Sequence, residues 1–155
     1  MIEIAARRRQ RSRRLDLERF RELMIAAAGL LKISEAELGF TLVGKAEMAR
    51  INQEFLKHSG PTDVITFSYG EEDANGAKER RIAGDVIICV DVAVNQATIF
   101  GTVWQSEVVR YGTHGMLHLL GFDDLSAGPR RKMKRVENRV MKLLGKKSAF
   151  RALLN

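Results

Sequence analysis

The chain has 155 residues, one cysteine and a formal net charge of +7 at pH 7. This length fits one domain with one hydrophobic core. The lone Cys89 excludes a disulfide framework and a thiolate metal cluster, which leaves oxygen and imidazole groups as metal ligands. The longest apolar stretch, residues 24–31, is far shorter than the roughly 20 residues of a membrane span, and no leader peptide opens the chain. We therefore expect a cytoplasmic protein with no membrane partner.

The first half of the chain predicts two helices and two strands. Apolar residues at helical spacing predict helices over residues 15–31 and 46–56, and residues 39–43 form a short β-prone run. Residues 62–69 are rich in β-branched side chains and are bounded by turn formers, which predicts a buried strand. Residues 68–81 have the composition of a loop throughout.

The second half predicts one more strand and three helices. A buried strand over residues 84–90 leads into a helix that begins near Asp91. The helix predicted over residues 102–121 begins with a capping pair, Thr102 and Gln105, and ends at Gly121. The last helix, residues 129–144, is amphipathic and has a proline in its first turn. Helices around a small sheet indicate an α+β or α/β domain.

The positive charge is concentrated at the two ends of the chain. Residues 1–14 contain six arginines and one acid, a charge of +5, and residues 128–155 contain ten basic residues and one acid, Glu137, a charge of +9; the rest therefore carries −7. This distribution predicts a polyanionic partner held by the ends, while the middle keeps carboxylates for metal binding or catalysis. The alternative is a solvated basic surface, with the arginine run as a solubilising or flexible arm.

The stretch HGMLHLLGFDD, residues 114–124, carries the clearest chemical signal. His114 and His118 are four residues apart, so a helix places both imidazoles on one face. Gly121 can turn the chain back, which brings Asp123 or Asp124 to the open end of the pair. Three protein ligands and a water make up a catalytic zinc site, which lowers the pKa of the water to about 7. In the alternative, both histidines are core or capping groups and Asp124 starts the next helix.

The same spacing is similar to that of the metzincin proteases, whose signature has a glutamate directly after the first histidine as general base. This chain has Gly115 there. A peptidase without that base lacks the residue that activates the attacking water, so a metzincin-like metallopeptidase is an alternative function and not the first choice.

The sequence resembles the YbeY family, the bacterial metal-dependent endoribonucleases also called rRNA maturation factors. The family pattern His-Gly-x-Leu-His-Leu-x-Gly-Tyr-Asp-His is matched by residues 114–124, and three upstream motifs follow in the same order. These are Asn-x-x-Phe, Pro-Thr-Asp-Val-Leu-Ser-Phe and Gly-Asp-Ile, matched at Asn52–Phe55, 61–67 and 84–86. The resemblance implies an α+β fold: one domain over residues 1–155, with about four strands in a mixed sheet, about five helices and a metal site at the end of a central helix. Residues 1–14 would be a basic N-terminal segment and residues 146–155 a C-terminal tail.

The resemblance also assigns the site. It makes His114 and His118 ligands of one Zn²⁺ per chain and puts the third ligand at Asp124, where most members have histidine. A carboxylate is an acceptable zinc ligand, although its charge makes the metal a weaker Lewis acid. Asp123 and His58 are the other candidates for this third position.

This chain also departs from the family pattern at a position where most members have a positively charged residue. The family usually has an arginine after the Asn-x-x-Phe motif, where this chain has Leu56. Lys57 or His58 is predicted to supply the cation, although a lysine lacks the bidentate fork of arginine. The alternative for both residues is a solvated loop.

We therefore predict a zinc-dependent endoribonuclease directed at single-stranded RNA, with His114, His118 and Asp124 acting through the metal. The resemblance implies a role in 16S rRNA 3′-end maturation and ribosome quality control, with precursor ribosomal RNA and the small ribosomal subunit as partners. A ribosome-associated factor with a purely structural metal is a second alternative. The sequence leaves the oligomeric state open.

Overall fold

A computed structural model describes residues 1–70, 80–147 and 150 of the chain. Within these ranges, four strands form one mixed sheet in the order β1-β2-β4-β3. Strand β2 pairs in parallel with β1 and with β4, and the edge strand β3 pairs antiparallel with β4. The elements are β1 (Ile2–Arg8), α1 (Leu17–Leu30), β2 (Ile33–Val43), α2 (Lys45–Leu56), β3 (Val64–Ser68), β4 (Arg80–Cys89), α3 (Val90–Phe100), α4 (Trp104–Leu119) and α5 (Ala127–Lys147).

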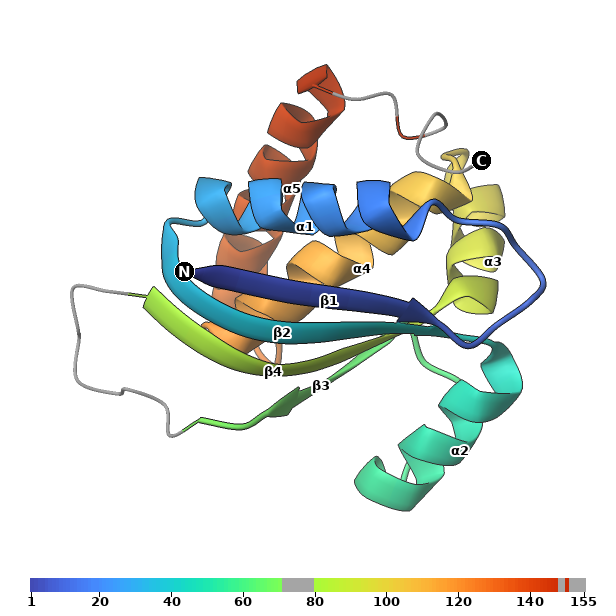
Figure 1. The fold of residues 1–155 in the computed structure, drawn as a ribbon. Coiled ribbons are helices and arrows are strands. Elements are labelled where there is room, and N and C mark those ends of the chain that lie inside the picture. The colour runs from blue at the N-terminus through green and yellow to red at the C-terminus, as the bar shows by residue number, and fades with distance from the viewer. Residues whose placement is uncertain (71–79, 148–149, 151–155) are drawn as a thin grey trace.

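The main hydrophobic core lies between one face of the sheet and the helices α1, α4 and α5 (Figure 1). Helix α4 is central, because it contacts β3, β4, α1, α3 and α5. Helix α2 lies apart from these helices, on the other side of the sheet, and covers a smaller apolar cluster around Met48. The predicted α+β fold of one domain, with about four strands and five helices, is confirmed.

Strand β1 is absent from the sequence prediction. It occupies half of the basic segment 1–14, because Ile2 and Ile4 alternate with polar residues and Ile4 is buried in register with Leu38. The arginine run hides this short period-2 pattern. Arg9, just after the strand, pairs with Glu47 at 3.0 Å. A flexible arm is therefore wrong for the start of this run, which is anchored to the sheet and to α2.

Several element boundaries also differ from the prediction. Strand β2 begins at Ile33 and β4 at Arg80, earlier than the apolar runs alone indicate, because each continues along its partner strand. The predicted loop over residues 68–81 therefore ends earlier, and its residues 71–79 lie outside the described ranges. Helix α5 is longer than predicted at both ends, and most of the predicted tail 146–155 also lies outside the described ranges.

The predicted capping pair of the histidine helix is wrong. Helix α4 has Val103 as its N-cap residue and no capping side chain. The Thr102 hydroxyl instead donates to the buried Glu107 carboxylate at 2.7 Å, across the start of the helix.

Among the helices of the described ranges, none combines the length and apolar character needed to cross a membrane.

Candidate metal centre and its cleft

Helix α4 carries the two histidines, and the chain reverses its direction just after this helix. After the helix, Gly121 has φ +94°, a left-handed conformation that glycine adopts at little cost. Its N–H donates to the His118 carbonyl, and the next N–H, of Phe122, donates to the Leu117 carbonyl. These two bonds form a complete Schellman motif, so the predicted stop at Gly121 is confirmed. The chain is thereby turned back toward the histidine face.

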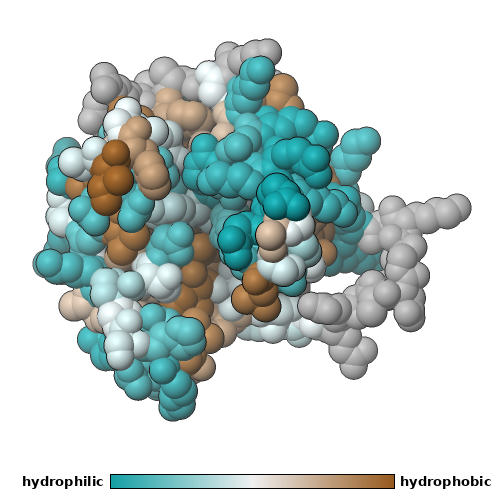
Figure 2. Space-filling model, turned by 180° about the vertical axis from the view of Figure 1, so that it is seen from behind, coloured by the Kyte–Doolittle hydropathy of each residue, from teal (hydrophilic) through white to brown (hydrophobic). Residues whose placement is uncertain are grey.

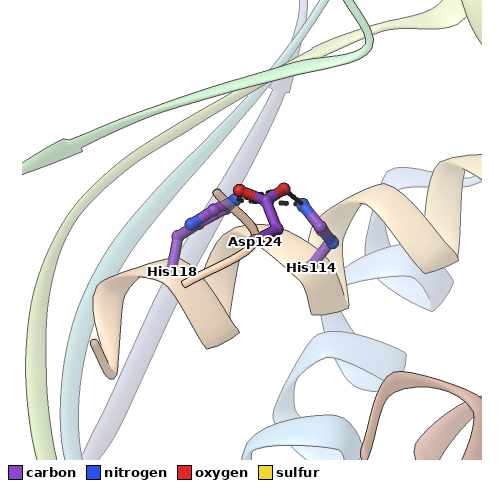
Figure 3. Close-up of side chains that lie close together, drawn as sticks. All are labelled: His114, His118 and Asp124. Carbon is purple, nitrogen blue, oxygen red and sulfur yellow. Dashed lines mark hydrogen bonds and ion pairs between the residues drawn. The ribbon is translucent and has the colours of Figure 1, made fainter. Parts of the chain in front are cut away.

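The reversal brings Asp124 to the histidine pair (Figure 3). The two Nε2 atoms of His114 and His118 are 3.0 Å apart, and Oδ2 of Asp124 lies 3.5 Å and 3.6 Å from them. In a tetrahedral zinc site with bonds of about 2.0–2.1 Å, neighbouring ligand atoms are about 3.3 Å apart. The three observed distances bracket that value, so the donor set and its spacing fit a tetrahedral metal ion.

The other candidates for the third ligand lie elsewhere. Among the described residues, His114, His118 and Asp124 are the group that could hold a metal ion. Asp123 accepts a hydrogen bond from the Leu125 N–H at 2.7 Å, which makes it a turn-forming residue. His58 is exposed, just after the end of α2, and is not in the group.

Glu137 supports the histidine pair and was not singled out as a site residue by the sequence. It lies on α5, is only 3% exposed, and its Oε2 is 2.8 Å from Nδ1 of His114. Its other oxygen accepts from the Arg110 guanidinium at 2.8 Å, and Arg110 also donates to Asn138. Metal-binding histidines characteristically donate their second N–H to such a carboxylate, which fixes the tautomer and the ring orientation.

The charges around His114 and Glu137 reinforce this arrangement. Burial disfavours the imidazolium of His114, but the hydrogen bond and charge of Glu137 outweigh it and raise the pKa of His114, with smaller effects of Asp63 and Asp124. Burial also disfavours the Glu137 carboxylate, while the hydrogen bonds from His114 and Arg110 lower its pKa overall. Glu137 is therefore ionised at neutral pH and accepts a hydrogen bond from Nδ1–H, which in the neutral form of His114 leaves Nε2 with a free lone pair.

His114 and Asp124 line a cleft of about 740 Å³. Its lining comes from α3, α4 and α5, together with Thr62, Asp63 and Asp124. Figure 2 shows this hollow, with the hydrophilic surface of α5 beside a hydrophobic strip. The wall from α5 carries Arg130, Arg131 and Lys134, all exposed. The α5 side of the cleft is therefore positively charged, whereas Asp63 and Glu107 also line the cleft. Its volume is that of a typical ligand site.

Lys57 and His58 are not brought to this cleft. Lys57 ends α2 in a left-handed conformation, and its amine contacts the Glu54 carbonyl. Both residues are exposed and neither is among those lining the cleft. The structure gives their predicted catalytic role no support. Among the described residues, the arginines and lysines that line the cleft are Arg110 and the α5 cations Arg130, Arg131 and Lys134.

Gly115, the position of the metzincin base, faces the sheet. A Cβ there would lie 2.6 Å from a methyl group of Val86 and 3.3 Å from that of Thr66. Helix α4 therefore packs so closely on β4 and β3 that the position requires glycine. A glutamate at this position has no room and does not reach the histidine face.

Comparison with known proteins assigns the family. The family model described as Endoribonuclease YbeY matches residues 3–145. The chain belongs to the YbeY family. Endoribonuclease YbeY of Aquifex aeolicus is 34% identical over 140 residues, 90% of this chain and 89% of that protein. The YbeY protein of Staphylococcus carnosus is 39% identical over 101 residues, 64% of this chain and 66% of the relative.

A solved structure has the same fold. The solution structure of TM1509 from Thermotoga maritima matches with a TM-score of 0.64 and 22% sequence identity, covering 95% of this chain and 91% of that protein. The resemblance stated from the four motifs is thus confirmed, and the chain is a member of a family named for cutting RNA. The predicted ligands His114 and His118 lie near the C-terminal end of the central helix α4, and Asp124 follows that helix.

The contact between Glu137 and His114 yields a first prediction. Glu137→Gln keeps the shape and a hydrogen-bond acceptor but removes the charge, so we expect metal affinity to fall about 10- to 100-fold, as for other carboxylates behind metal-binding histidines. Titration with zinc against a chromophoric chelator measures this. Glu107→Gln is the matched control, because Glu107 is a buried carboxylate of the same cleft that accepts a hydrogen bond from Thr102 and does not contact the histidines. Equal zinc affinity in the Glu137 variant and the wild type would contradict the assignment.

Proposed function

We propose that this YbeY-family chain is a zinc-dependent endoribonuclease that cuts single-stranded RNA. The observation that carries the proposal is the group formed by His114, His118 and Asp124, which has tetrahedral spacing and lies at a cleft with a cationic wall. Phosphodiester substrates are polyanionic, so a metal that polarises a phosphoryl oxygen and cations that hold neighbouring phosphates serve the same reaction.

The residues of the chain have distinct parts in this proposal. His114 and His118 would hold the metal through Nε2, and Asp124 would hold it through a carboxylate oxygen. A zinc ion in such a site supplies Lewis acidity and lowers the pKa of water. Glu137 orients His114 and fixes the tautomer of its neutral ring with the proton on Nδ1, and Arg110 holds Glu137 in its charged form through the 2.8 Å ion pair. Because protons compete with the metal for His114, metal affinity should decline as the pH falls through its raised pKa.

The biological substrate is proposed from the family resemblance. We propose precursor 16S ribosomal RNA as the substrate, cut during 3′-end maturation and in ribosome quality control. The small ribosomal subunit is then the partner and the cytoplasm the site of action. The basic α5 wall supports a nucleic-acid substrate.

The two alternatives have less support. A metzincin-like peptidase needs a base at position 115, where the packing on Val86 leaves no room for a side chain. A purely structural metal is normally enclosed by four protein ligands. Here the histidines and Asp124 supply three ligand atoms, and His114 and Asp124 line an open cleft.

A cleavage assay tests the proposed activity. The purified protein is incubated with matched single-stranded and double-stranded RNA oligonucleotides, with chelator, and with chelator followed by excess zinc. We expect cleavage within the single-stranded RNA that chelator abolishes and zinc restores. Chemical analysis of the product ends then distinguishes attack by water from attack by the ribose 2′-hydroxyl. Cleavage that persists in chelator, or no cleavage at any zinc concentration, would contradict the proposal.

The basic wall of α5 yields a second prediction. Replacing Arg131 and Lys134 by glutamine should weaken RNA binding and reduce the slope of log affinity against log salt by about 1.4, since each contact with a single strand contributes about 0.7. Arg130 is left in place because its guanidinium donates to the Asp124 backbone carbonyl at 3.1 Å.

The matched control removes the same charge from positions of α5 that do not line the cleft. Arg135 and Arg139 are exposed on α5 but do not line the cleft. Replacing both by glutamine changes the net charge equally, so it should leave the salt slope closer to that of the wild type. Equal slopes for the two double variants would show that only the total charge of α5 matters.

A further inference from the structure

The two walls of the cleft have different chemistry. The α5 wall carries three cations, whereas the α3 wall carries Val92, Gln96 and Phe100, which have no charge. These three residues are spaced i, i+4 and i+8, so they lie along one face of α3. A groove with cations on one side and an aromatic ring on the other matches the way proteins hold single-stranded nucleic acid, in which cations follow the phosphates and aromatic rings stack on bases.

Phe100 is the exposed aromatic side chain of this wall. It is 67% exposed, although it lines the cleft, so the fold does not use its ring as core. Its neighbour Ile99 is similarly exposed, at 63%, but is not among the residues that line the cleft. Comparing variants of Ile99 and Phe100 therefore distinguishes the effect of exposed hydrophobic surface in general from the effect of an aromatic ring that lines the cleft.

The position of Phe100 relative to the metal group follows from α4. Thr102, two residues after Phe100, contacts Glu107 through its hydroxyl. Glu107 precedes His114 by seven residues, which is a rise of about 10 Å along the helix. Phe100 therefore lies toward the end of the cleft remote from the histidine pair, where it can reach a neighbouring nucleotide and not the phosphate at the metal.

We propose that Phe100 is the stacking platform of a base subsite between α3 and α5, which holds a nucleotide flanking the cut position in single-stranded RNA. The phosphates of that strand face Arg131 and Lys134. The subsite accepts any base, because every base presents a π-face to the ring. This inference rests on the proposed function, since the occupant is its RNA substrate.

Binding of a labelled single-stranded RNA oligonucleotide, measured by fluorescence anisotropy with EDTA present to prevent cleavage, tests the subsite. Loss of one stacked base typically weakens binding by about 5- to 150-fold. We expect this loss for Phe100→Ala and Phe100→Leu, whereas Phe100→Trp should bind as the wild type does. Ile99→Ala is the matched control and should also bind like the wild type. Thermal melting checks that each variant is folded.

A set of RNAs, each lacking the base at one different position, gives a second test. Loss of the base at one particular position should weaken binding to the wild type but should not change the affinity for Phe100→Ala. Wild-type affinity in Phe100→Ala, an equal loss in Ile99→Ala, or no binding of single-stranded RNA by the wild type would each overturn the subsite. RNA that binds through Phe100 but is not cut when zinc is present would instead overturn the proposed activity and leave the subsite standing.

Discussion

Replacing His118 by alanine should empty the metal site and abolish RNA cleavage. Its Nε2 is one of three converging ligand atoms, 3.0 Å from Nε2 of His114 and 3.6 Å from Asp124. Two remaining ligands hold zinc poorly, and metal catalysis contributes several kcal/mol to transition-state stabilisation. We therefore expect a loss of activity of at least about 100-fold, measured together with the zinc content of the purified variant. His114→Ala should behave in the same way, with an added cost because it leaves the buried Glu137 without this partner.

His58→Ala is the matched control for this prediction. It removes the third histidine of the chain, which is exposed and lies outside the ligand group. This variant should keep its zinc and its activity. Full zinc occupancy in His118→Ala, or loss of zinc in His58→Ala, would contradict the assignment of the ligands.

The second large effect concerns the two aspartates after the turn. Asp124→Ala should lose zinc affinity, because its carboxylate completes the group, while Asp124→His should restore the common family donor set and keep or tighten zinc. Asp123→Ala should leave the metal in place and lower the free energy of unfolding by about 1 kcal/mol, because it removes the hydrogen bond from the Leu125 N–H.

Zinc titrations and chemical denaturation of the three aspartate variants measure these two effects separately. The prediction makes Asp124 a metal ligand and Asp123 a residue that stabilises the turn, so the alanine variant of each aspartate is the control for the other. If Asp123→Ala loses zinc and Asp124→Ala retains it, the third ligand is Asp123 and the assignment of Asp124 is wrong by one residue.

Local sequence spacing predicts the central part of the site. His114 and His118 share a face because four residues make about one helical turn, and Gly121 stops the helix at the distance that returns Asp124. The choice between Asp123 and Asp124 depends on the direction of each side chain after the turn. The spacing leaves that choice open, and the structure shows Asp124 facing the histidines.

The rest of the site depends on packing between distant segments. Glu137 is 23 residues from His114 and meets it only because α5 packs against α4. A sequence signal did exist, since Glu137 is the one acid among ten basic residues in residues 128–155 and follows the buried Met133 by four positions. An acid on the apolar face of a basic helix needs a buried partner. The cleft between α3 and α5 has no such local signal.

Stoichiometric zinc titration of the metal-depleted wild type tests the central claim most directly. The protein is stripped with chelator, dialysed, and assayed for cleavage of single-stranded RNA after each addition of zinc. If His114, His118 and Asp124 form one catalytic metal site per chain, activity should rise linearly and reach its plateau at one zinc per chain. Full activity in the metal-free protein, or a plateau reached only with several metal ions per chain, would contradict the account.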